Sequence, residues 1–170
     1  MKTLLLGAGT SRDKRIAPPG STKEWGELTT VDLQDADIIH DLNVFPYCFN
    51  SPHWTNKDLY DEIHAYEVLE HLGTQGDFKF FFDQFNELHR WLKPGGFLCI
   101  SVPLPTSIWA FGDLGHTRVL PETVFMYLTE KFYDQLGKTP CADYRHLIKN
   151  YWTIEGMSES KGLLYVLLRA

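Results

Sequence analysis

Residues 3–10, TLLLGAGT, are the stretch that most constrains the fold. The apolar run at residues 3–6 predicts a buried β-strand, and the glycines Gly7 and Gly9 follow it directly. Glycine allows a sharp turn and a close approach between the backbone and a ligand. A strand that enters a Gly-x-Gly turn therefore indicates a ligand-binding α/β fold, although the pattern alone is weak. Ser11 follows, and the third glycine of the dinucleotide-binding pattern is missing.

Length and composition are those of a globular protein. The chain has 170 residues, of which 44% are hydrophobic and 22% are charged. A chain of this length is expected to form a single domain, residues 1–170, with a sizeable core. The formal net charge of −6 disfavours nucleic acid as a partner, because binding a phosphate backbone requires clustered lysine and arginine.

The cysteines and the hydropathy pattern favour a location in the cytoplasm. Cys48, Cys99 and Cys141 are far apart and form no CxxC pair, so neither a zinc ribbon nor a disulfide framework is expected. No apolar run approaches the ~18 residues that cross a membrane, and the first residues do not match a signal peptide. We therefore expect a cytoplasmic protein without a membrane partner.

Short apolar runs alternate with loops and helical patterns, which favours an α/β fold with a largely parallel sheet. Further strands are expected at residues 28–32, 37–42, 61–66 and 96–103. Apolar residues spaced by three and four predict a helix over residues 78–92, with its aromatic face on the sheet. A second helix is expected over residues 120–137, because Pro121 fits a first helical turn and Gly137 a stop. Two strand-like runs within residues 150–170 predict a hairpin at the sheet edge.

Two connections in the first half of the chain lack helical character. Residues 12–27 contain a Pro-Pro-Gly run and residues 43–60 contain two prolines, and proline interrupts helices. We expect loops in both places, so that helices cover one face of the sheet only thinly. The aromatic-rich loop at residues 45–54 is expected to cover part of that face.

An acidic residue, Asp32, ends the second expected strand. A carboxylate in this position can accept hydrogen bonds from two ribose hydroxyls, although a solvent-facing aspartate at a strand end fits the pattern equally well. Nicotinamide-dependent dehydrogenases and S-adenosylmethionine-dependent methyltransferases both match these features. The dehydrogenase alternative requires a third glycine and a helix after Gly9, and the sequence has neither.

Two further stretches favour the methyltransferases. Residues 60–73, YDEIHAYEVLEHLG, and residues 92–103, LKPGGFLCISVP, resemble the fourth-strand and fifth-strand segments of class I S-adenosylmethionine-dependent methyltransferases. The resemblance covers most of the chain and is nearest to a small methyltransferase-like subgroup with a shortened first crossover. It implies a Rossmann-like fold with a mostly parallel seven-stranded sheet, a C-terminal antiparallel hairpin and reduced helices in the first two crossovers.

The resemblance also implies a binding site for S-adenosyl-L-methionine. The implied cofactor-binding residues are Gly7, Ala8, Gly9, Thr10, Asp32, Leu33, Asp41, Leu42 and Tyr66. The glycine turn would line the amino-acid end of the cofactor, Asp32 would hold the ribose, and Tyr66 would lie near the transferred methyl group. The residues that follow the second and third strands would contact the adenine. Leu5 stands where family members carry an acidic residue that helps to hold the cofactor's ammonium group.

Residues 67–71 form an E-x-x-E-H group that suggests two further roles, metal binding and proton transfer. On a helix, Glu67, Glu70 and His71 share one face and could hold a divalent metal, with His116 as a fourth ligand. Small-RNA 2′-O-methyltransferases and ubiquinone-pathway O-methyltransferases use such a group. Because V-L-E-H also recurs in the family without metal, we favour a site without one. His71 and His116 are the expected catalytic bases, and Arg118 is expected to position an anionic substrate.

The sequence therefore predicts an S-adenosylmethionine-dependent methyltransferase that acts on a small-molecule or saccharide-type acceptor. Two alternatives stay open: a non-catalytic cofactor-binding or scaffold protein of the same fold, and an RNA-modifying methyltransferase. The RNA alternative requires a basic groove, which Lys14, Arg15, Arg118 and Arg145 would supply only if they cluster.

Overall fold

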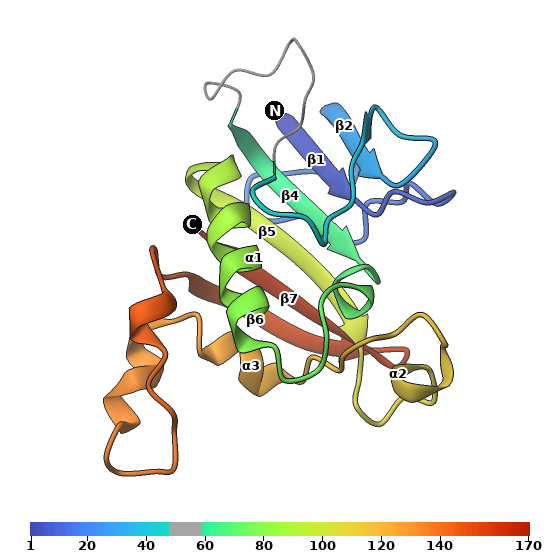
Figure 1. Cartoon of the computed structure of the whole chain (residues 1–170). Coiled ribbons are helices and arrows are strands. Elements are labelled where there is room, and N and C mark those ends of the chain that lie inside the picture. The colour runs from blue at the N-terminus through green and yellow to red at the C-terminus, as the bar shows by residue number, and fades with distance from the viewer. Residues whose placement is uncertain (48–58) are drawn as a thin grey trace.

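The structure, a computed structural model, describes residues 1–47 and 59–170. It contains a seven-stranded sheet in the order β3-β2-β1-β4-β5-β7-β6 (Figure 1). The strands are β1 (Lys2–Leu6), β2 (Glu27–Asp32), β3 (Ile38–Ile39), β4 (Tyr60–Tyr66), β5 (Leu92–Pro103), β6 (Thr153–Ser160) and β7 (Leu163–Arg169). The first five strands are parallel to one another, and β7 is antiparallel to both β5 and β6. The expected fold class and the C-terminal hairpin are confirmed.

The strand order places a topological switch between β1 and β4. From β1 the chain moves outward through β2 to β3, and β4 then pairs with the other side of β1. Ligands of open α/β sheets bind outside the carboxyl ends of the strands at such a point. We call this edge, formed by the ends of β1, β2, β4 and β5, the carboxyl edge. The arrowheads of β1, β4 and β5 mark it in Figure 1.

Helix α1 (Phe78–Trp91) packs on one face of the sheet (Figure 1). The side chain of Asp77 caps its N-terminus by accepting a hydrogen bond of 3.0 Å from the backbone N–H of Phe80. The buried apolar residues of α1 follow the predicted spacing and form the main core with β1, β4, β5 and β7: Phe81, Phe82, Phe85 and Leu88. In the described part of the chain, no helix is long and apolar enough to cross a membrane.

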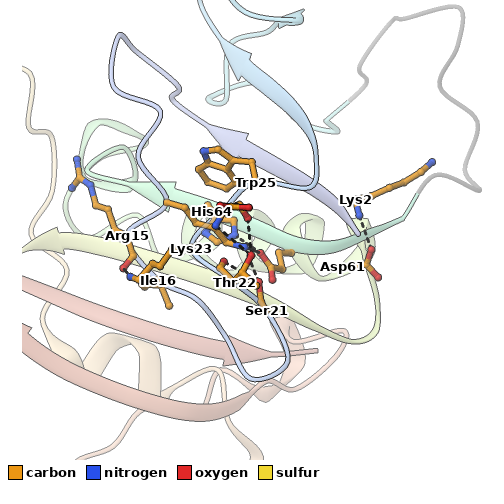
Figure 2. Close-up of polar contacts among 12 residues, drawn as sticks. Lys2, Arg15, Ile16, Ser21, Thr22, Lys23, Trp25, Asp61 and His64 are labelled. Atoms are coloured by element: carbon orange, nitrogen blue, oxygen red, sulfur yellow. Dashed lines mark hydrogen bonds and ion pairs between the residues drawn. The ribbon is translucent and has the colours of Figure 1, made fainter.

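The opposite face of the sheet is covered at β1, β4 and β5 by residues 12–25, which form neither helix nor strand and which we call the strap (Figure 2). Ile16 and Trp25 of the strap pack against a small buried cluster that includes Leu5, Tyr66 and Cys99. The predicted absence of a helix in this crossover is confirmed, and the Pro-Pro-Gly run explains it.

Buried polar groups attach the strap to β4. The Lys14 ammonium, whose side chain has no exposed surface, lies 2.7 Å from the Glu62 carboxylate. Nε2 of His64 lies 2.8 Å from the same carboxylate, and Nδ1 of His64 lies 2.6 Å from the Tyr66 hydroxyl. That hydroxyl accepts a hydrogen bond of 2.9 Å from the backbone N–H of Ile16. Because side chains alternate along a strand, the three β4 residues all point toward the strap.

These contacts define the protonation state of His64. Burial lowers the pKa of His64 below its usual value of 6.5 and outweighs the opposite effect of Glu62. The neutral ring donates its Nε2–H to Glu62 and accepts the Tyr66 O–H at Nδ1. Burial alone would raise the pKa of Glu62, but the hydrogen bonds from His64 and Lys14 lower it to about 2. Lys14 and Glu62 therefore form the charged pair of this network.

The helix predicted over residues 120–137 is wrong as a single element. It is divided into α3 (Glu122–Met126) and the 3-10 helix η2 (Glu130–Gln135). The Thr129 hydroxyl donates a hydrogen bond of 2.9 Å to the Met126 carbonyl, and the Leu128 carbonyl accepts the backbone N–H of Trp152. These bonds use carbonyl groups that a continuous helix would need.

The third strand is also shorter than predicted over residues 37–42. The Asp41 carboxylate accepts a hydrogen bond of 2.9 Å from the backbone N–H of Asn43, which turns the chain after β3. The remaining short helices are η1 (Leu69–His71), α2 (Trp109–Gly112) and η3 (Arg145–Leu147). Most of the loop predicted at residues 43–60, including Cys48, lies outside the described residues.

We predict that His64 makes the fold sensitive to acid. A histidine whose pKa is lowered by folding stabilises the protein above its unfolded pKa, and this contribution is lost as the pH falls below that value. The free energy of unfolding, measured by urea denaturation, should therefore fall as the pH drops below the usual histidine pKa of 6.5 because of this group. The His64→Gln variant should be less stable at pH 7.5 and should lack this part of the decrease.

His146→Gln is the matched control, because His146 is exposed on η3. This variant should keep the pH dependence of the wild type. If the two variants show the same pH dependence, a neutral buried His64 is excluded.

Candidate functional site

The turn after β1 lies at the carboxyl edge and is held by the end of β2. Gly7 and Gly9 have φ values of 59° and 49°, in the left-handed region that favours glycine. Space also excludes a side chain at Gly7, since a Cβ atom there would lie 2.5 Å from Cγ2 of Val68. The backbone N–H of Gly9 donates a hydrogen bond of 2.8 Å to Oδ2 of Asp32. Asp32 therefore fixes the shape of the turn.

Asp32 retains the capacity to bind a ligand. Its other oxygen, Oδ1, accepts a hydrogen bond of 2.7 Å from the backbone N–H of Leu33, and the residue is partly exposed. Each carboxylate oxygen has a further lone pair for an incoming hydroxyl. Leu33 and Ile39, at the ends of β2 and β3, are 66% and 61% exposed. The edge thus combines a carboxylate with exposed apolar surface.

The structure leaves some of the predicted cofactor-binding residues accessible and buries others. The exposed ones are Gly9, Thr10, Leu33 and Asp41, whereas Gly7 and Asp32 are half-buried. Ala8 is 2% exposed beneath the strap, and Leu42 is 5% exposed within the main core. Tyr66 is 8% exposed, and its hydroxyl is hydrogen-bonded within the strap network. The last three side chains are therefore already used in packing.

Backbone contacts bring a second group of predicted residues together at η1. The carbonyl of Glu70 accepts hydrogen bonds from the backbone N–H groups of Thr117 (2.9 Å) and Arg118 (3.2 Å). Nε of Arg118 donates a hydrogen bond of 2.9 Å to the Leu69 carbonyl. These bonds hold the segment after α2 against η1, and they place His116 beside Glu70.

Glu70, His71 and His116 each present one potential ligand atom, and these atoms lie within 4.8 Å of one another. Nε2 of His116 is 4.0 Å from Oε1 of Glu70, and the two imidazole rings meet edge to face with centroids 4.6 Å apart. Nδ1 of His71 lies 3.0 Å from the carbonyl oxygen of Gly115 and must donate to it. The lone pair of Nε2 of His71 is then available for a proton or a metal ion.

The Glu70 carboxylate is an unusual group. It is 2% exposed, and neither of its oxygens has a hydrogen-bond partner in the described residues. Burial raises the pKa of Glu70 to about 7, and the nearby negative charges of Glu67 and Asp113 act in the same direction. A buried carboxylate without donors destabilises a fold, so such a group is a candidate for a role in function.

Glu67 lies outside this group, which corrects the predicted arrangement. The residue has a φ of 54°, and η1 begins only at Leu69, so Glu67 is not on the helix that the spacing predicted. Its carboxylate pairs with Arg15 of the strap. The predicted metal group of four residues is therefore reduced to three.

Arg118 is buried rather than presented to solvent. It is 5% exposed, and its guanidinium bonds to the Leu69 carbonyl and to the Gln84 side chain. It also lies over the ring of Phe80, 5.3 Å from the centroid. In the described residues its contacts connect η1 with α1.

Sequence reasoning missed the contact between the strap and the ends of β4 and β5. Arg15 bonds to Glu67 and lies 3.4 Å from Oγ of Ser101, and its guanidinium is 5.3 Å from the centroid of the Tyr66 ring. A signal was available in the sequence. A crossover without a helix must cover the sheet with its own side chains, and a buried Glu62 in the middle of the sheet needed a cationic partner.

Exposed apolar side chains on and around α2, which we call the apolar projection, border the group of Glu70, His71 and His116. Four side chains on α2 and its flanks are more than half exposed: Ile108, Trp109, Phe111 and Leu114. They belong to the segment that contributes His116 and that lies next to the carboxyl edge (Figure 1). Exposed apolar side chains of this kind suit a contact with another molecule.

In sequence, the chain matches no protein-family model and no curated protein. In fold, it is similar to solved methyltransferase structures. One is the 1,6-didemethyltoxoflavin-N1-methyltransferase of Burkholderia thailandensis with bound 1,6-didemethyltoxoflavin and S-adenosylhomocysteine. It is 13% identical, the match covers 99% of this chain and 70% of that chain, and the TM-score is 0.55.

Two further solved methyltransferase structures are similar to this chain in fold. The N-methyltransferase NodS of Bradyrhizobium japonicum WM9, in complex with S-adenosylhomocysteine, is 16% identical, with 99% and 76% of the two chains covered and a TM-score of 0.52. An S-adenosylmethionine-dependent methyltransferase of Mesorhizobium loti is 15% identical, with 99% and 90% covered and a TM-score of 0.53. The chain therefore has the fold of class I S-adenosylmethionine-dependent methyltransferases.

Proposed function

We propose that the protein binds S-adenosyl-L-methionine at the carboxyl edge and transfers its methyl group to a small-molecule or saccharide-type acceptor. The observation that carries this proposal is the Asp32 carboxylate, held 2.8 Å from the Gly9 N–H in the glycine turn next to the topological switch. The exposed side chains of Leu33 and Ile39 beside it suit the flat face of an adenine. Two of the similar solved structures contain S-adenosylhomocysteine, the product of this cofactor.

The transfer requires little chemistry from the protein. The sulfonium of the cofactor already activates the methyl carbon, so the protein mainly aligns the acceptor and excludes water. In the absence of a bound metal ion, Nε2 of His71 is the group best placed to accept a proton from an oxygen or nitrogen acceptor, because Nδ1 is fixed by Gly115. The apolar projection around α2 offers a surface for an acceptor with an apolar part.

The positions of the basic residues argue against an RNA substrate. The Lys14 side chain has no exposed surface, and Arg118 is 5% exposed. Arg15 and Arg145 are each paired with an acidic side chain. These four residues therefore do not form the basic groove that the RNA alternative requires.

We predict that Asp32→Ala abolishes cofactor binding. The variant loses both the carboxylate that would bind the ribose and the acceptor that shapes the glycine turn, so the affinity should fall by about a hundredfold or more. Titration calorimetry with S-adenosylhomocysteine measures this change directly. Asp83→Ala, which removes an exposed carboxylate from α1, should bind as the wild type does.

The same titration separates the competing functions. Saturable binding to the wild type that Asp32→Ala lacks, followed by methyl transfer to a member of an acceptor panel, supports the enzyme. Saturable binding without any transfer supports the cofactor-binding or scaffold alternative. If S-adenosylhomocysteine does not bind to the wild type, the proposal is wrong.

As a second proposal, we infer that Glu70, His71 and His116 bind a divalent cation. The unpartnered, buried carboxylate of Glu70 favours this and reverses the preference for a metal-free site that the sequence suggested. Two imidazoles and one carboxylate suit Zn²⁺, Mn²⁺ or Fe²⁺ better than Mg²⁺ or Ca²⁺, which prefer oxygen ligands. Such an ion would act as a Lewis acid that lowers the pKa of an acceptor hydroxyl.

We predict that Mn²⁺ or Zn²⁺ raises the unfolding temperature of EDTA-treated protein by several degrees, because an ion that binds only the folded state stabilises it. Glu70→Gln should lose this shift, since the amide is a poorer ligand and leaves no buried charge to neutralise. Glu122→Gln, an exposed substitution on α3, should keep it. Equal shifts in both variants, or no shift in the wild type, would exclude the site. Calorimetric scanning without any acceptor provides the measurement.

A further inference from the structure

The amino-acid end of S-adenosylmethionine carries an ammonium and a carboxylate, and both need partners when they leave water. If the proposed function holds, this chain must meet that need in its own way. Leu5 replaces the acidic residue that the resemblance implies, and it is 2% exposed beneath the strap. The glycine turn leads into the strap rather than into a helix, so no helix N-terminus offers its N–H groups and partial positive charge.

Arg15 and Glu67 form an ion pair at the carboxyl edge, beside the glycine turn. Glu67 is the first residue after β4, and its neighbour Val68 packs directly against Gly7. Arg15 enters from the strap and also approaches Ser101 of β5. Figure 2 shows the Arg15 side chain extending beyond the rest of the strap toward this edge. One positive and one negative charge thus lie beside the glycine turn, which the resemblance assigns to the amino-acid end of the cofactor.

The pair is accessible and has unused bonding capacity. The side chains of Arg15 and Glu67 are 30% and 41% exposed. The hydrogen bonds from Arg15 to Glu67 and Ser101 use Nη1 of the guanidinium, and Glu67 accepts with Oε2. The guanidinium has further N–H donors in the forked geometry that matches a carboxylate, and Glu67 has a second oxygen for an ammonium.

The strap holds Arg15 in position from both sides. The preceding residue, Lys14, is anchored by its buried ion pair, and the following residue, Ile16, donates its N–H to the Tyr66 hydroxyl. The Lys23 ammonium donates to the Arg15 carbonyl. A side chain that is ordered before the ligand arrives loses less conformational freedom on binding.

The backbone of Glu67 is also fixed in an uncommon conformation. Its φ of 54° is rare for a residue other than glycine and destabilises the chain locally. Its N–H donates a hydrogen bond of 2.8 Å to the Ser101 carbonyl, which holds it there. This conformation directs the chain from the end of β4 into η1 and sets where the Glu67 side chain begins.

We propose that Arg15 and Glu67 together bind the amino-acid end of S-adenosylmethionine, with Arg15 on its carboxylate and Glu67 on its ammonium group. The strap thereby supplies the cationic partner that a crossover helix would otherwise provide. Glu67 supplies the anionic partner that is missing at Leu5. This proposal deepens the proposed function and depends on it.

Two ligands test this assignment by titration calorimetry on the full chain. S-adenosylhomocysteine contains the amino-acid end, and 5′-methylthioadenosine contains only the nucleoside and the thioether. Arg15→Gln should weaken S-adenosylhomocysteine by about tenfold or more, because it removes a charge-assisted pair, and should leave 5′-methylthioadenosine within about twofold. Glu67→Gln should have the same selective effect.

Arg12→Gln is the matched control, since Arg12 also lies in the strap and its guanidinium donates a hydrogen bond of 3.5 Å to the backbone carbonyl of Asp35 rather than to Glu67. It should bind both ligands as the wild type does. Undiminished binding of 5′-methylthioadenosine also shows that a variant is folded. Equal losses for both ligands, or no loss for either, in Arg15→Gln would overturn the assignment while leaving the proposed function intact. A wild type that binds neither ligand overturns both.

Discussion

The rest of the structure depends on the buried ion pair between Lys14 and Glu62. Two charges have been removed from water here, and their separation of 2.7 Å and their further partners offset the cost of that removal. Ser21 bonds to the ammonium, and His64 bonds to the carboxylate. Removing one member of such a pair leaves the other charge buried and typically costs about 3–5 kcal/mol. The pair thus fixes where the strap lies on the middle of the sheet, because another position would leave a buried charge without its partner.

This attachment allows a segment without helix to do what a helix does in other α/β folds. A helix satisfies its own backbone and covers a sheet with an apolar face. The strap cannot do so, and its apolar contribution is limited to residues such as Ile16 and Trp25. Polar partners on the sheet are therefore required, which explains why Glu62, His64 and Tyr66 stand in a central strand. The apolar face of α1 on the other side needs no such partners.

The sequence predicts those features of the structure that depend on residues close together in the chain. It fails where a feature depends on a contact with a residue distant in sequence. The strands, α1 and the position of Asp32 come from short periodic patterns and from turn residues, which are local. The predicted helix over residues 120–137 was wrong because the Leu128 carbonyl bonds to Trp152, a partner distant in sequence. The resemblance offered Glu70, His71 and His116 only as part of a metal set that was not favoured, and the structure brings these three residues together. The position of Glu67 was not predicted, because its backbone conformation depends on a contact with β5.

Because the strap both covers the sheet and contacts the ligand, the stability of its packing and the affinity for the ligand depend on each other. In a crossover that forms a helix, these two properties are separate. The partial positive charge at a helix N-terminus comes from the helix backbone, so it does not require one particular side chain to be held in place. Arg15, in contrast, keeps its position only while Lys14 and Ile16 hold the strap on β4. By thermodynamic linkage, a ligand that binds Arg15 stabilises the attachment of the strap to β4 by as much as that attachment strengthens binding. The buried pair at Glu62 therefore influences affinity without touching the ligand, and the acid sensitivity of His64 extends to the carboxyl edge.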